Sequence, residues 1–106
     1  MKEVKAYIRI EKLNEVVLAL AQIDGLAGVS VSKVTGFGRS RGQLRLINFD
    51  THIKVESVCT DEIKDQVVQA ILRSARSGER QDGKVFVSTV DEAWRIETGT
   101  PCNDAP

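Results

Sequence analysis

The feature that most constrains this chain is a change of hydrophobic period that occurs twice, in the same order. In the first half, apolar and polar residues alternate from Val4 to Ile10, apolar residues recur at three- and four-residue steps from Lys12 to Ile23, and alternation returns from Val29 to Val34. Alternation predicts a half-buried strand, and the wider spacing predicts an amphipathic helix. The first half is therefore predicted to form strand, helix and strand, with Asp24-Gly25 ending the helix.

The second half repeats this order. Alternation runs from His52 to Cys59, a helical stripe follows an N-cap at Thr60-Asp61, and Lys84 to Val90 alternate again. The expected buried stripes consist of Leu13, Val16, Val17, Leu20 and Ile23 in the first helix and of Ile63, Val67, Ala70, Ile71 and Ser74 in the second. Two such halves are typical of an α+β fold, the ferredoxin-like βαββαβ sandwich, in which an antiparallel sheet has two helices on one face.

The other face of that sheet is expected to be covered by a second subunit. Its positions mix polar residues with four large apolar ones, Tyr7, Val34, Val58 and Phe86, and an apolar patch of this kind in water favours association. A short fifth strand is expected at Trp94 to Ile96, followed by a frayed end from Thr98 to Pro106.

Composition excludes several classes of function. The 106 residues carry 15 Lys+Arg against 15 Asp+Glu, so no net positive field attracts nucleic acid or an anionic membrane. The single histidine, His52, allows neither a convincing Ser-His-Asp triad nor a finger-like zinc site, and we expect no catalytic and no metal-binding residues. No apolar run is long enough for a signal peptide or for insertion into a membrane, so we expect a cytoplasmic protein of one domain.

The two cysteines are too few for a disulfide framework. Cys59 shares the buried face of the third strand and is expected to be a core thiol. Cys102 lies near the end of the chain and is expected to be exposed.

Two glycine-containing loops carry cations that suit an anion. The first, Gly36 to Arg45, has three glycines and three arginines and is expected to be flexible. The second, Gly78 to Lys84, has the spacing G-x-x-x-x-G-K, but Val85 stands where a P-loop needs Ser or Thr, and this loop joins a helix to a strand. Its backbone N–H groups and Lys84 still suit a phosphate; the alternative is an ordinary turn.

Three collinear motifs resemble the PII signal-transduction proteins of nitrogen regulation. They are Gly36-Phe37-Gly38-Arg39 followed by Gly42, then Ser77-Gly78-x-x-x-Asp82-Gly83-Lys84-Val85-Phe86-Val87, and then Ala93-Trp94-Arg95-Ile96-x-Thr98-Gly99. The resemblance covers about residues 1–99, which we therefore expect to be one PII-like domain, followed by a flexible tail at residues 100–106.

The resemblance implies a homotrimer with an adenine nucleotide in three clefts between neighbouring subunits. The loop after the second strand, the T-loop (about residues 37–51), would contact a protein target such as a transporter or an enzyme, and the B-loop (about residues 77–84) would hold phosphates. Carried over to this chain, the nucleotide-binding residues are Ser30, Gly38, Arg39, Ser40, Val58, Ser77, Gly78, Gln81, Asp82, Gly83, Lys84 and Arg95. The protein would be a regulator and not an enzyme.

The chain departs from the family pattern at four places. The T-loop is several residues shorter and lacks the tyrosine that is uridylylated. Ser40 replaces a glutamine that ligates magnesium and recognises 2-oxoglutarate, Gln81 replaces a glycine, and Glu97 replaces an arginine that would face the phosphates. Glu97 would share a strand face with Arg95 and repel the longest phosphate chain most, so ADP or AMP is expected to bind more tightly than ATP.

These departures indicate a paralogue with a retuned ligand and partner. One expected role is in inorganic-carbon regulation, with bicarbonate as a second effector and a link to bicarbonate transport or carboxysomes. The alternatives are a nitrogen-regulatory or metal-efflux-associated paralogue that controls a transporter, and a nucleotide-free structural or metal-binding trimer. A small phosphohydrolase built on the same cleft is the alternative from another class, but it lacks a convincing base and a magnesium-binding carboxylate cluster.

Overall fold

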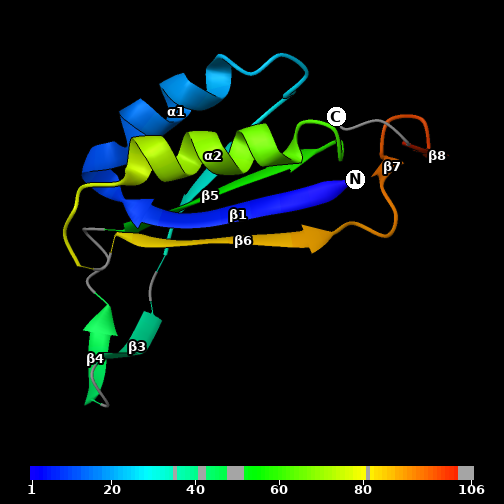
Figure 1. Ribbon diagram of the computed structural model, residues 1–106. Helices are drawn as coiled ribbons and strands as arrows, with labels where there is room; N and C mark the ends of the chain where they lie inside the picture. The colour runs from blue at the N-terminus through cyan, green and yellow to red at the C-terminus, as the bar shows by residue number, and fades with distance from the viewer. Residues whose placement is uncertain (35, 41–42, 48–51, 81, 103–106) are drawn as a thin grey trace.

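The computed structural model describes residues 1–34, 36–40, 43–47, 52–80 and 82–102. Two helices pack beside each other over one face of a four-stranded sheet, and a two-stranded hairpin extends away from one end of that sheet (Figure 1). A second, smaller hairpin lies at the other end, near the C-terminus (Figure 1). The described part of the chain therefore forms two layers and two appended hairpins.

The sheet follows the expected ferredoxin-like topology. It contains β1 (Lys2–Arg9), β2 (Ser30–Lys33), β5 (His52–Cys59) and β6 (Gly83–Thr89) in the order β2-β5-β1-β6. Every neighbouring pair is antiparallel. Strands β1 and β2 thus run in the same direction with β5 between them, which is the split βαβ arrangement. The predicted fold class is confirmed.

The core lies between the sheet and the helices α1 (Leu13–Ala21) and α2 (Lys64–Ala75). Alternate residues of β1 and β5 are buried there: Val4, Ala6, Ile8, Ile53, Val55, Ser57 and Cys59. The helices add Val16, Leu20, Val67, Ala70, Ile71 and Ala75. Cys59 is a core thiol as predicted, and burial raises its pKa.

The residues at both helix starts differ from the prediction. Ile10, expected on the buried face of the first strand, opens a 3-10 helix (η1, Ile10–Lys12) and is exposed, because the ladder of β1 ends at Arg9. Asp61, expected to cap the second helix, instead accepts a hydrogen bond from the Met1 amine at 2.9 Å, and α2 begins at Lys64 without a side-chain cap. Val17, expected in the buried stripe, is 40% exposed.

The segment after β2 was predicted to be a loop between strands, and its described residues form a hairpin instead. Strands β3 (Gly36–Ser40) and β4 (Gln43–Ile47) pair antiparallel from Gly36↔Ile47 to Ser40↔Gln43. Backbone N–H and C=O groups supply this ladder, so a high content of glycine and arginine does not prevent it. Residues 41, 42 and 48–51 of the expected T-loop lie outside the described residues.

The C-terminal segment also differs from the prediction. Strand β7 (Trp94–Arg95) pairs with β8 (Thr100–Pro101), so within the described residues the expected fifth strand belongs to a separate hairpin. Cys102 is 9% exposed, and its N–H donates to the Ala93 carbonyl at 2.8 Å. Its predicted exposure is wrong because the hairpin returns the chain to the residue before β7. Residues 103–106 lie outside the described residues.

The sheet face away from the helices carries the expected apolar residues of β1, β5 and β6. The rings of Tyr7 and Phe86 meet edge to face with centroids 6.2 Å apart, and Phe86 is 50% exposed. Val58 lies on the same face, opposite Glu3. Both helices cover the opposite face of the sheet (Figure 1). That a second subunit covers the face with Tyr7 and Phe86 stays a prediction.

Candidate functional site

The candidate site lies at the end of the sheet where β1 and β2 finish and β5 and β6 begin. The register pairs Arg9 with His52 and Ile8 with Gly83, so the loop before β6 lies beside the end of β1. The β3–β4 hairpin follows β2 and extends from this same end (Figure 1). The fold therefore brings both glycine-containing segments to one end of the molecule.

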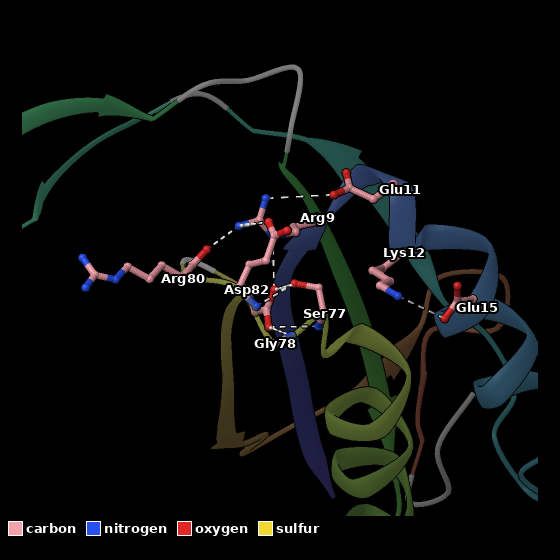
Figure 2. Close-up of polar contacts among 9 residues, drawn as sticks. Arg9, Glu11, Lys12, Glu15, Ser77, Gly78, Arg80 and Asp82 are labelled. Atoms are coloured by element: carbon pink, nitrogen blue, oxygen red, sulfur yellow. Dashed lines mark hydrogen bonds and ion pairs between the residues drawn. The ribbon is translucent and has the colours of Figure 1, made fainter.

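Asp82 closes the loop between α2 and β6 (Figure 2). Its carboxylate accepts hydrogen bonds from the backbone N–H groups of Ser77 at 3.0 Å and Gly78 at 3.2 Å, and from the Ser77 hydroxyl. The Ser77 oxygen also accepts a hydrogen bond from the Glu79 N–H at 3.1 Å. The first half of the loop is thus wrapped around an internal carboxylate.

Arg9, at the end of β1, anchors the same loop from the sheet, and the sequence analysis missed it. Its Nε donates to Asp82 Oδ1 at 3.1 Å, and its Nη2 donates to the Arg80 carbonyl. Glu79 and Glu11 lie 3.9 and 4.0 Å from its guanidinium nitrogens, and only 16% of the Arg9 side chain is exposed. The signal that identifies Arg9 is the strand order of this fold, which sets the last residue of β1 beside the residue before β6.

These donors lower the pKa of Asp82 from its ordinary value of 3.8 to about 2. The Ser77 hydroxyl contributes most, then the Ser77 N–H, and Arg9 and the Gly78 N–H add to the same effect. Hydrogen bonds to the ionised form favour that form. Asp82 is therefore a fixed negative charge inside the loop at neutral pH.

The loop enters β6 through a glycine that no other residue can replace without a shift of backbone. Gly83 has φ +116°, and a Cβ there would lie 1.7 Å from the Tyr7 carbonyl oxygen. Lys84 follows, and together with Asp82 it lines a pocket of about 320 Å³ between α2 and β6. Arg73 and Arg76 line the same pocket. The pocket thus has three cationic side chains and one carboxylate, that of Asp82, which is paired with Arg9. Such a pocket could bind an anionic group.

A second pocket, of about 500 Å³, lies at the opposite edge of the sheet. Ser30 and Val58, two of the expected nucleotide-binding residues, both line it. Glu56 lines it as well and was not among the expected site residues. The Ser57 hydroxyl fixes the backbone before β2 by donating to the Gly28 carbonyl at 2.6 Å. Strands β2 and β6 are the two edge strands of the sheet. Within a single chain, this pocket and the pocket beside Lys84 are therefore separate.

Four of the remaining expected site residues lie in the two hairpins. Gly38, Arg39 and Ser40 belong to β3 and pair with residues of β4. Arg95 is an exposed residue of β7. Gln81 lies outside the described residues.

Glu97 occupies the turn between β7 and β8, where the Gly99 N–H donates to the Arg95 carbonyl at 2.8 Å. The expected strand alignment of Glu97 with Arg95 is therefore wrong, because the chain turns directly after Arg95.

Together the fold and the site define a ferredoxin-like α+β domain with a carboxylate-closed loop and a projecting hairpin at the same end of its sheet. Within the described residues, no group of three or more His, Cys, Asp or Glu side chains is arranged to hold a metal ion. None of the helices in the described part of the chain has the length and apolar character needed to cross a membrane.

Comparison with known proteins gives the family. Residues 1–100 match the family model described as nitrogen regulatory protein P-II. The nitrogen regulatory protein P-II of Nostoc punctiforme is 43% identical over 112 aligned positions that cover 99% of each chain. Those of Bradyrhizobium diazoefficiens and Rhizobium meliloti are 39% and 41% identical with the same coverage. The chain belongs to the P-II family of nitrogen regulatory proteins, which are signal-transduction regulators and not enzymes.

The same alignments are longer than this chain. They span 112 positions, whereas this chain has 106 residues, so at least six positions have no residue in this chain. That these positions fall in the T-loop stays a prediction.

Proposed function

We propose that this P-II protein senses adenine nucleotides in clefts between the neighbouring subunits of a homotrimer. The observation that carries the proposal is the separation of two pockets: Ser30 and Val58 line one at the β2 edge of the sheet, and Lys84 lines the other beside β6. In a closed ring with a head-to-tail interface, one edge of each subunit meets the opposite edge of the next. Such a ring would join the two pockets once at every interface.

The two pockets suit the two ends of a nucleotide. The pocket of Ser30 and Val58 would take the adenine base, which is flat and partly apolar. Lys84, with Arg39 and Arg95 contributed by the two hairpins, would bind the phosphates through charge-assisted hydrogen bonds. The backbone of Asp82 and Gly83 would present further donors. The N–H groups of Ser77 and Gly78 already donate to Asp82, so these two residues would act by shaping the loop.

ADP or AMP is proposed to bind more tightly than ATP. Glu97 stands two residues after Arg95, in the turn of the same hairpin, and its repulsion grows with the number of phosphate charges. Ser40 supplies no amide oxygen to organise magnesium, which removes a second support for the triphosphate. The protein would then report a low adenylate energy charge.

The β3–β4 hairpin is proposed to carry the signal to a protein target. From Gly25 to Phe49 the chain has no acidic residue, while Lys33, Arg39, Arg41 and Arg45 supply four positive charges. A complementary target surface is therefore acidic. Because Gly38 to Ser40 belong to β3, the first strand of the hairpin, a nucleotide in the cleft would bias the position of the hairpin.

The pathway is proposed from the departures of this chain from the family pattern, since the relatives are named as nitrogen regulatory proteins. The shortened T-loop without the modified tyrosine favours a different input, for which we propose bicarbonate as a second effector. The target would be a transporter or an enzyme of inorganic-carbon handling, contacted in the cytoplasm.

Calorimetric titration with AMP, ADP and ATP in the presence of magnesium tests the nucleotide proposal. We expect ADP or AMP to have the lowest Kd, and Glu97→Arg to move the preference toward ATP. Tightest binding of ATP, with an order unchanged in Glu97→Arg, would contradict the preference. A melting temperature that none of the three nucleotides raises would replace the proposal by a nucleotide-free trimer.

A further inference from the structure

The proposed phosphate loop already contains an anion of its own. In the first half of the loop, the N–H groups of Ser77 and Gly78 donate to the Asp82 carboxylate. A phosphate has no access to these two donors while Asp82 stays in place. The carboxylate would also repel a phosphate if its charge were not balanced.

Arg9 supplies the balancing charge. Its guanidinium contacts the Asp82 carboxylate at 3.1 Å, and its side chain is 16% exposed, so most of its surface lies inside this network. It also holds the Arg80 carbonyl oxygen, a second electronegative atom of the loop, through Nη2. Figure 2 shows all three groups converging on the end of β1.

The position of Arg9 makes this contact rigid. Strands β1 and β6 are paired continuously from Lys2↔Thr89 to Ile8↔Gly83. Arg9 is the next residue of β1, and Asp82 is the residue before β6. The side-chain ion pair therefore lies one position beyond the last backbone pair and connects the loop to the sheet beside Lys84.

We infer that Arg9 is a positioning residue of the phosphate loop, because it holds the Asp82 carboxylate and the Arg80 carbonyl and so fixes the loop in the shape that presents Lys84 to an anion. The inference rests on the proposed nucleotide function and deepens it. Arg9 acts through Asp82, so the effects of removing Arg9 and of removing the Asp82 charge should not add.

Amide hydrogen exchange in the nucleotide-free protein, followed by NMR, tests directly whether Arg9 and Asp82 hold the loop in place. We expect the Ser77 and Gly78 amides to exchange at least about tenfold faster in Asp82→Asn and in Arg9→Ala. Arg9→Lys should restore part of the protection. Lys12→Ala is the matched control, since it removes a neighbouring cation whose contact is Glu15 at 3.5 Å, outside the loop (Figure 2). Equal exchange at both amides in wild type and Arg9→Ala would overturn the inference.

Titration with ADP then tests the effect on binding. The Kd should rise about tenfold in Arg9→Ala and in Asp82→Asn, and the double variant should be no weaker than the worse single variant. Additive losses would overturn the inference, because Arg9 would then contact the ligand independently of Asp82. A wild type that binds none of the nucleotides would overturn the proposed function, and amide exchange would still decide the role of Arg9.

Discussion

Among single residues, Lys84 is the cation placed most directly for a nucleotide phosphate. It is the second residue of β6 and lines its pocket together with Arg73 and Arg76. Lys84→Ala should weaken ADP binding by about ten- to a hundredfold, the loss of one charge-assisted contact of roughly 1.5–3 kcal/mol. Lys64→Ala is the control, because Lys64 pairs with Asp65 at the start of α2. An ADP affinity that Lys84→Ala leaves unchanged would move the phosphate site elsewhere.

The lowered pKa of Asp82 predicts how the stability of the folded chain changes in acid. Its folded pKa of about 2 lies below the ordinary value of 3.8, so its ionised form stabilises the folded chain above about pH 4, and this contribution is lost as the pH falls toward 2. Urea unfolding of wild type and Asp82→Asn should therefore show a stability difference at pH 7 that shrinks across this window. The same difference at pH 7 and near pH 2 would show that Asp82 is not held as the structure indicates.

At the scale of elements, the junction between loop and strand depends on the close approach of two backbones. Gly78 and Gly83 both have positive φ, but only at Gly83 would a Cβ meet another backbone, at 1.7 Å from the Tyr7 oxygen. Gly78→Ala should cost about 1 kcal/mol of the free energy of unfolding, and Gly83→Ala roughly 3 kcal/mol. Chemical denaturation of the pair measures the difference. Equal losses would mean that β1 and β6 do not approach as closely as the structure has them.

Elements with a strong hydrophobic period could be predicted from the sequence, and a hairpin without such a period could not. The alternation from His52 to Cys59 predicts β5 with its observed bounds because one face of that strand is fully buried. The β3–β4 hairpin has no such burial pattern, and its glycines and arginines predict a loop. The start of α2 was missed because Asp61 binds the Met1 amine, a contact between residues far apart in the chain.

Part of the candidate site could also be predicted from the sequence. Glycine spacing locates the loop from Ser77 to Lys84, and the resemblance adds Ser30 and Val58. Arg9 carries no local signal, because its partner Asp82 is 73 residues away and becomes a neighbour only through the sheet. The burial of Cys102 has the same origin, since it follows from the pairing of β7 with β8.

At the scale of the whole molecule, the sheet face away from the helices should be the one that assembles. Phe86 is 50% exposed on that face and touches Tyr7, whereas Leu18 is 65% exposed on α1, in the other layer. Phe86→Asp should convert the trimer to smaller species in light scattering, and Leu18→Asp should leave it intact. A wild type that is a stable monomer at micromolar concentration would remove the trimer, and with it the shared cleft.

Subunit mixing tests most directly whether neighbouring subunits share the nucleotide site. Lys84→Ala disables one half of the proposed site, and Ser30→Trp fills the pocket of the other half, so a trimer of either variant alone should bind ADP weakly. In any ring that contains both variants, one interface joins an intact Lys84 to an intact Ser30. Co-expressed and purified mixed trimers should therefore bind one ADP with wild-type affinity in calorimetry. Mixed trimers that bind ADP no better than the two separate variants would contradict a site shared between subunits.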